Sequence, residues 1–291
     1  MPLDSDARPR AATQGAADVR DVGTLTYRAF QSPEDAAACV ALQSEIWGAA
    51  FADQVPASLL RVATSIGGLA VGAFADDGAM VGFVFSLAGI RDGEPIHWSH
   101  MLAVREAARG SGIGRRLKEA QRAELARRGI ARVLWTFDPL QARNAHLNFN
   151  RLGVRVVDYV ENMYGITQSP LHHGLATDRL VVMLPTAVAS VERSIPAYAS
   201  NGSVPIRTPF PRPGDASDDA TGAPAVLIEI PHDLQAVVSR APAEATVWRM
   251  GTRASFRAAL RDGYEVLGLR RDQAAGRAFY VLADPKQLPS G

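Results

Sequence analysis

The sequence has little of three things that mark particular classes of protein: cysteine, long apolar runs and net charge. Its single cysteine, Cys39, excludes an intramolecular disulfide and suits a reducing compartment. No run of about 18 apolar residues argues for a membrane-spanning helix, and the polar first residues do not predict a signal peptide. A formal charge of +1 gives no global field for nucleic acid or an anionic membrane. We therefore expect a cytoplasmic protein without nucleic-acid or membrane partners.

What the chain does have is the composition of an ordinary folded protein. Its 291 residues are 47% hydrophobic and 21% charged, enough for two domains or one elaborated domain. The polar, aperiodic residues 1–23 predict a flexible N-terminal arm, and a stretch rich in Pro, Gly, Ser and Asp predicts a linker or long loop at 191–224. These boundaries leave a main domain at 24–190 and a C-terminal α/β segment at 225–291.

The order of predicted elements indicates the fold class. Ser32 and Pro33 mark the start of a helix, and Asp76-Asp77-Gly78 predicts the turn of a hairpin between two apolar strands. After residue 90 come a strand, a glycine-led helix closed by Gly129, and a buried-type strand, RVLWTF. We therefore predict an α/β fold with a mixed sheet and at least one parallel crossover.

The C-terminal segment repeats the element order of residues 24–90: strand, helices, strand, turn, strand. Such similarity suggests a degenerate internal repeat as a hypothesis. The hypothesis requires the two halves to share strand topology.

A cluster of glycines lies at the end of one predicted strand, in MLAVREAARGSGIG (101–114). Glycines at a strand-to-helix junction let backbone N–H groups approach a ligand, and the helix N-terminus adds unpaired donors and partial positive charge. These features favour an anion site for phosphate or pyrophosphate, where Arg109 offers a charged fork for the same oxygens.

The type of phosphate site follows from the spacing. The loop lacks the Gly-Lys-Ser/Thr ending of a nucleotide-triphosphate loop and the full spacing of a Rossmann fingerprint. What is left is Arg109-x-x-Gly112-x-Gly114 after a strand that ends in LAV. In this pattern the sequence resembles the GNAT superfamily of acyl-CoA-dependent acyltransferases, whose central motif is Arg/Gln-x-x-Gly-x-Gly/Ala. The competing interpretation is a plain turn before a helix.

The resemblance implies a fold and a co-substrate. It implies a GNAT-like mixed central sheet flanked by helices over residues 24–190, with a C-terminal α/β extension, and acetyl-CoA or another acyl-CoA as co-substrate. The coenzyme A pyrophosphate would lie on the loop and the pantetheine beside the preceding strand. The positions assigned in this way are Leu102, Ala103, Val104, Arg109, Gly110, Ser111, Gly112, Ile113 and Gly114.

A second stretch, RNAHLNFNRLGV, resembles the second motif of the same family. By that resemblance Asn144 and Phe149 belong to the coenzyme site. Many family members carry, just before the Leu-Gly, a tyrosine that protonates the departing thiolate. This chain has Asn150 there, and an amide cannot serve as that acid. Tyr159 and Tyr164 are nearby alternatives, each with an ordinary core or surface role as the competing interpretation.

Two histidines precede the glycine loop on the same predicted strand. His97 and His100 are three positions apart, so they point to opposite faces and only one faces the cleft. An imidazole titrates near neutral pH and can take a proton from an acceptor amine. We favour His100 because it is closer to the motif. The competing interpretation, for either residue, is a buried histidine bonded to a neighbour.

Asp138, in WTFDPL, follows a buried-type strand, at the carboxyl end where α/β proteins gather ligands. It is a third catalytic candidate, either holding the substrate ammonium or acting as base. Equally, it caps the helix that begins near Ala142. The adjacent pair His172-His173 lacks further ligands at suitable spacing, so we predict no metal.

These features predict an acyl-CoA-dependent N-acyltransferase that moves an acetyl or succinyl group to a primary amine by direct attack in a ternary complex. Amino acids are a reasonable acceptor class, because SHMLAV and WTFDPL resemble an uncharacterised bacterial GNAT subgroup with members linked to N-succinylation of amino acids. The alternatives are a GNAT-shaped acyl-CoA-binding module without transferase activity, and an enzyme whose loop binds another phosphorylated ligand. The long C-terminal segment leaves a homodimer open.

Overall fold

The computed structural model describes residues 24–49, 51–165, 174–187, 204–212, 215 and 222–287. The predicted N-terminal arm, the pair His172-His173 and most of the predicted linker lie outside these residues. Within the described part, no helix combines the length and the apolar character needed to cross a membrane.

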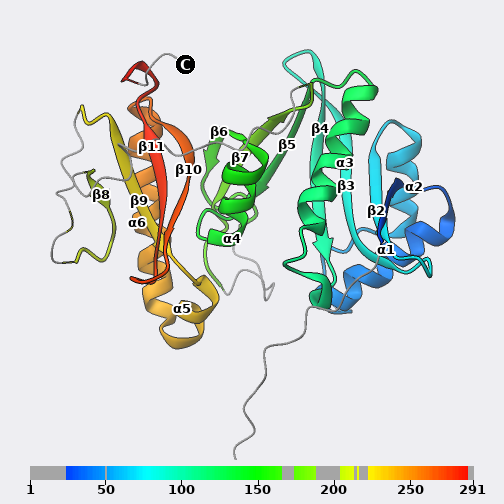
Figure 1. The fold of residues 1–291 in the computed structure, drawn as a ribbon, viewed down its shortest axis with the longest axis horizontal. Helices are drawn as coiled ribbons and strands as arrows, with labels where there is room; N and C mark the ends of the chain where they lie inside the picture. Colours follow the sequence, from blue (N-terminus) through cyan, green and yellow to red (C-terminus); the bar gives the residue numbers. More distant parts are fainter. Residues whose placement is uncertain are drawn as a thin grey trace, which may run out of the picture.

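The main part of the chain forms a seven-stranded sheet with the order β1-β2-β3-β4-β5-β7-β6 (Figure 1). Neighbouring strands are antiparallel, except that β4 and β5 are parallel. The predicted parallel crossover is therefore confirmed, as is the predicted mixed α/β fold. The strands are β1 (Thr26–Ala29), β2 (Leu69–Phe74), β3 (Met80–Arg91), β4 (Glu94–Val104), β5 (Arg132–Phe137), β6 (Arg155–Val160) and β7 (Arg179–Pro185).

Helices cover both faces of this sheet. In the view of Figure 1, α3 (Ile113–Arg127) and α4 (Ala142–Ala145) lie in front of it. The helices α1 (Pro33–Trp47) and α2 (Ala57–Ser65) pack with β2 and β3 in a separate apolar cluster. The start of α1 is confirmed by a local contact, because the Ser32 side chain accepts a hydrogen bond from Asp35 N.

The C-terminal part forms a four-stranded sheet with the order β10-β11-β9-β8 (Figure 1, left). The hypothesis of an internal repeat is wrong. In the first half the strand before the helices pairs with the strand directly after them, whereas here β9 pairs with the last strand, β11. The elements are β8 (Ile206–Arg207), β9 (Ala225–Pro231), α5 (Leu234–Arg240), α6 (Pro242–Arg261), β10 (Glu265–Asp272) and β11 (Arg277–Ala283).

The two sheets share one apolar core, and aromatic rings connect them. Phe149, which follows α4, packs edge-on against Tyr280 of β11. Tyr280 in turn contacts Phe256 of α6, and Phe256 stacks on Tyr159 of β6. Aromatic pairs of this kind contribute about 0.5–1.5 kcal/mol each beyond their buried area. The C-terminal part is therefore an integral layer beside the β6 side of the main sheet.

Candidate functional site

The seven-stranded sheet opens between β4 and β5. Their parallel pairing is limited, among the described residues, to His97–Val133 and Trp98–Leu134, although β4 continues to Val104 and β5 to Phe137. A β-bulge coincides with the opening, because Phe85 and Ser86 of β3 pair with residues 101 and 99 of β4 and skip His100. Beyond this fork, one edge of β4 offers backbone groups to a ligand that can pair like a strand. The predicted pantetheine positions, Leu102, Ala103 and Val104, lie on this part of β4.

The glycine loop follows directly. Gly110 and Gly112 have φ values of +88° and +84°, which favour glycine, and no atom lies within 4 Å of a Cβ built at either position. Gly112 is the N-cap of α3 and makes no side-chain cap bond, so no cap side chain occupies the N–H groups of the first turn. Arg109 is exposed and its Nε donates to Val104 O at 3.2 Å, between the strand edge and the loop.

The remaining predicted loop residues support this arrangement. Ser111 Oγ donates to Ala108 O at 2.6 Å and holds the turn closed. Ile113 is buried under the first turn of α3. Gly114 faces Leu102 and Val104, where an added Cβ would make ordinary contacts at 3.6 and 3.9 Å. The loop therefore presents backbone on its outer side and is anchored by apolar contacts on its inner side.

The structure places the two histidines on opposite faces of β4, as predicted. His97 is buried on the side of α3 and its Nδ1 lies 2.9 Å from Ser86 Oγ. Burial lowers the pKa of His97 to about 4, and the charge of Arg128 acts in the same direction. This is the environment of a structural histidine. His97 therefore does not reach the open side of the fork.

His100 is exposed, and its ring stands edge-on to Phe85 on the opposite face of the sheet. Partial withdrawal from water lowers the pKa of His100, and the negative charge of Asp53 opposes this shift. The imidazole is consequently neutral near pH 7 and has a free nitrogen lone pair.

Asp138 is engaged by the C-terminal part of the chain. Arg249 of α6 donates to both carboxylate oxygens, at 2.8 and 2.6 Å, and Leu140 N donates to Oδ1 at 2.8 Å. The side chain of Arg249 is 3% exposed and that of Asp138 14%. The helix α4 receives no side-chain cap, so Asp138 does not cap it. Asp138 is therefore a largely buried interface residue whose oxygens are bonded by Arg249 and Leu140, with the Arg179 guanidinium 3.8 Å away.

The residues of the second motif divide between surface and core. Asn144 is exposed on α4, near the open end of β5. Phe149 is fully buried, with its ring packed edge-on between Phe137 and Tyr280, so it supports this segment from within and offers no surface to a ligand. The segment itself, His146–Leu152, is a π-helix that ends at Gly153.

The side-chain amide of Asn150 is bonded to the backbone of the C-terminal part. Its Nδ2 donates to Leu269 O at 3.1 Å, and its Oδ1 accepts from Leu269 N at 2.9 Å. The amide thus bonds one residue of β10 in both directions, next to the bulge at Val266–Gly268. A tyrosine would carry a single hydroxyl oxygen in place of the separate donor nitrogen and acceptor oxygen of this amide.

Lys118 is a buried residue at the fork that sequence reasoning missed. Its Nζ donates to Ser99 Oγ at 2.7 Å and lies 3.7 Å from the ring centroid of Trp135. Ser99 and Trp135 are the first residues beyond the last β4–β5 pair. Burial lowers the pKa of Lys118 to about 7. The sequence feature that could have pointed to Lys118 is the rarity of lysine, because the chain has only one other lysine, Lys286, among many arginines.

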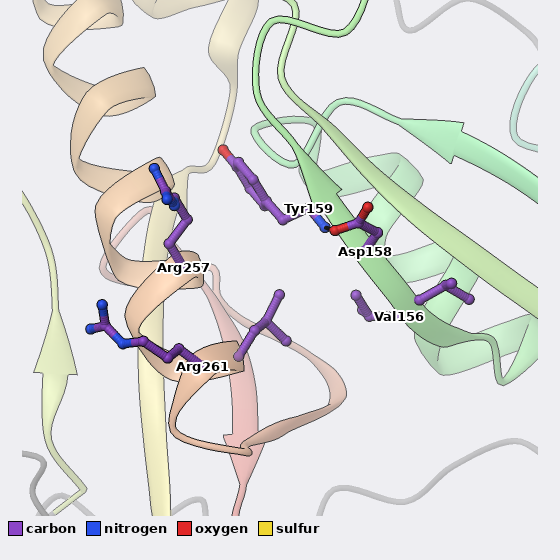
Figure 2. Close-up of a pocket in the computed structure, with 7 residues that line it drawn as sticks. Val156, Asp158, Tyr159, Arg257 and Arg261 are labelled. Atoms are coloured by element: carbon purple, nitrogen blue, oxygen red, sulfur yellow. Dashed lines mark hydrogen bonds between the residues drawn. The ribbon is translucent and has the colours of Figure 1, made fainter.

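A separate groove of about 520 Å³ lies between β6 and the C-terminal half of α6 (Figure 2). Val156, Asp158 and Tyr159 line one side, and Arg257 and Arg261 the other. Strands β5 and β7 separate it from the fork. Arg257 pairs with Glu161, so its charge is already compensated. The described residues contain no group of three or more His, Cys, Asp or Glu side chains placed to hold a metal ion.

One family model matches the part of the chain that contains the fork and the glycine loop. Residues 70–155 match the model of a family described as acetyltransferase (GNAT) domain. This range contains the fork, the glycine loop, α3 and the π-helical segment. A search of the curated proteins found no match.

Solved structures with a similar fold include several acetyltransferases. The ribosomal-protein-S18-alanine N-acetyltransferase from Escherichia coli aligns with 19% identity over 59% of this chain and 100% of its own, at a TM-score of 0.45. Naa50 from Arabidopsis thaliana, in complex with the bisubstrate analogue CoA-Ac-MVNAL, aligns with 16% identity. The alignment covers 55% of this chain and 97% of Naa50, at a TM-score of 0.43. Aminoglycoside 6'-acetyltransferase type Ii aligns with 19% identity over 56% of this chain and 99% of its own, at a TM-score of 0.45.

The family match identifies a GNAT acetyltransferase domain at residues 70–155 of this chain. The matched range ends at residue 155. The four-stranded sheet and α6 are therefore additions to the matched domain.

Proposed function

We propose that the chain transfers an acyl group from coenzyme A to a primary amine at the fork between β4 and β5. The observation that carries this proposal is the continuity of the unpaired β4 edge, the glycine loop and the uncapped start of α3. Pantetheine amides can pair with a strand edge, and a pyrophosphate suits the N-terminus of a helix. The three features occur in the order in which the coenzyme presents these groups.

Local charge supports the same assignment. The stretch from Arg105 to Arg116 contains four arginines and one glutamate, although the whole chain carries a formal charge of only +1. Arg109 is the exposed side chain held at the junction of strand and loop. A guanidinium there can give charge-assisted hydrogen bonds to phosphate oxygens.

The chemistry requires a neutral amine and a group that takes its proton. The amine nitrogen attacks the thioester carbonyl carbon, the C–S bond breaks, and the electron pair goes to the sulfur. His100 is exposed beside the fork, and its lowered pKa keeps it neutral near pH 7, as a proton acceptor must be. We assign His100 as the proton acceptor and Asn144 as a contact of the pantetheine arm.

The acyl group is acetyl or succinyl in this proposal, and amino acids are the first acceptors to test. A cytoplasmic location and a homodimer stay predictions from the sequence. The second candidate function is an acyl-CoA-binding module without transferase activity. It is favoured by one observation, the engagement of Asn150 by Leu269 at the position of the family's acid.

The test is incubation of the full chain with acetyl-CoA or succinyl-CoA and a panel of amino acids and small amines. Thiol release and the mass of the acylated amine are measured together. The proposal predicts stoichiometric CoA release and one N-acylated product. Tight CoA binding without any product would favour the binding module. Absence of both binding and turnover would contradict both functions.

A further inference from the structure

A transferase built on this fork must return a proton to the departing coenzyme. When the C–S bond breaks, the sulfur leaves as a thiolate, and a positioned acid accelerates that step. Asn150 cannot act as this acid, and its amide is bonded to Leu269 on both sides. A positioned acid at this site must therefore be another O–H group near the open end of β5, and without one the thiolate takes its proton from water.

Tyr159 does not meet this requirement. Its hydroxyl donates to Asp178 Oδ2 at 2.7 Å, and its ring stacks on Phe256 of α6. Burial and the neighbouring carboxylate raise the pKa of Tyr159 above its usual value. The phenol is therefore committed to the junction between the two sheets, on the side of β6 away from the fork.

Tyr164 has its O–H group near the open end of β5, as the acid must. Its hydroxyl lies 3.2 Å from Thr136 Oγ1 on β5, two residues beyond Leu134, the last residue of β5 that pairs with β4. Alternation along the strands puts Thr136 on the face of Leu134, and His100 on the face of Trp98. Leu134 and Trp98 share one apolar cluster. The Tyr164 hydroxyl therefore approaches the fork from the same face as His100.

The turn that carries Tyr164 is held by several hydrogen bonds. Tyr164 N donates to Thr177 Oγ1 at 2.9 Å, and Thr177 Oγ1 donates to Gly165 O at 2.9 Å. Thr177 N donates to Asn162 Oδ1 at 3.1 Å, where Asn162 has a φ of +44°. The guanidinium of Arg179 lies 5.3 Å from the ring centroid of Tyr164. A side chain that is 50% exposed is thus fixed at its base and along its ring, while its hydroxyl lies against Thr136 of β5.

We propose that Tyr164 is the general acid of the transfer, an assignment that rests on the proposed function. As the C–S bond breaks, the sulfur takes the phenolic proton of Tyr164 and leaves as a thiol. The phenolate is reprotonated by water, and the proton lost by the amine leaves through His100. Thr136 accepts or donates the hydrogen bond that orients the phenol before the reaction.

The first test needs no acceptor amine. Coenzyme A is bound to the full chain, and its thiol is titrated through the ultraviolet absorbance of the thiolate. A hydrogen bond from Tyr164 favours the thiolate, so Tyr164→Phe should move the midpoint of the bound thiol to higher pH by about one to two pH units. Tyr264→Phe removes a phenol in the C-terminal part, which donates to Ala223 O, and should leave the midpoint unchanged.

The second test follows turnover with the amine found active. Tyr164→Phe should lower kcat by about 10²- to 10⁴-fold with an unchanged KM for acyl-CoA. Equal thiol midpoints and equal kcat in the wild type and Tyr164→Phe would overturn the assignment while leaving the transferase intact. A wild-type chain that does not bind coenzyme A would instead remove the proposed function, and this assignment with it.

Discussion

Asn150 and Leu269 exchange two hydrogen bonds, so that an amide on the π-helical segment bonds a β10 residue as a neighbouring strand would. The two residues are 119 positions apart in the chain. Their contact connects the C-terminal sheet to the segment in which the family places a proton donor. The C-terminal part therefore fixes the amide that stands where the family motif has its tyrosine.

Asn150→Ala should destabilise the fold, because it removes both bonds and leaves Leu269 N and O without their partner. Leu269 is buried, so water cannot replace the amide freely. We expect a loss of about 1–3 kcal/mol in the free energy of unfolding, measured by urea denaturation. Asn144→Ala on the exposed face of α4 is the control, and an equal loss in both variants would contradict the account.

The pair Arg249–Asp138 should contribute far more than an exposed pair of the same chemistry. Arg249→Met removes the guanidinium that bonds both oxygens of the largely buried Asp138 carboxylate and leaves only Arg179, 3.8 Å away. We expect a loss toward the lower end of about 3–5 kcal/mol. Arg240→Met breaks an exposed pair with Glu244 and should cost less than about 1 kcal/mol. Urea denaturation of both variants measures the difference. Equal effects would show that the first pair is solvated in solution.

Lys118 should make stability depend on pH in a specific direction. Its pKa is about 7 in the folded chain, below its usual value of 10.5, so between these values the unfolded chain binds one more proton. This group therefore makes stability rise with pH from about 7 to 10, by up to about 1.4 kcal/mol per pH unit. Lys118→Met should remove that slope in denaturation curves taken at several pH values. If the pH dependence of the unfolding free energy were the same in the variant, the Lys118 ammonium would be solvated in the folded chain.

His100 should set the low-pH limit of activity. Its lowered pKa means that it becomes protonated, and unable to accept a proton, only at pH values below its usual range. His100→Gln should lower kcat by on the order of 10²-fold and remove this acid limb from the pH–rate profile. The measurement is steady-state turnover between pH 5 and pH 9. An unchanged profile would exclude His100 as the proton acceptor.

Features encoded locally were predictable from the sequence. The cap at Ser32, the turn at Asp76-Asp77-Gly78 and the crossover through α3 depend on neighbouring residues, and the structure confirms all three. The position of the glycine loop at the start of α3 follows from the same kind of signal.

Contacts across long stretches of sequence were not predictable. In the sequence Asp138 is only a carboxylate at a strand end. Its partner Arg249 lies 111 residues later, and no local pattern connects the two. Phe149 matched a motif by spacing, but it lies within a π-helix and packs against Tyr280, so its ring is in the core. The sequence also could not show which of Tyr159 and Tyr164 has its hydroxyl bonded to Asp178. That contact depends on the pairing of β6 with β7, which only the sheet order reveals.

The measurement that tests the central claim most directly is calorimetric titration of the full chain with coenzyme A, alongside Arg109→Ala and the control Arg127→Ala at the exposed far end of α3. We predict micromolar binding to the wild type and to Arg127→Ala, and binding weakened by about tenfold to a hundredfold in Arg109→Ala, which loses a charge-assisted bond to phosphate. No heat of binding in the wild type, or equal affinity in all three proteins, would contradict a coenzyme site at the glycine loop.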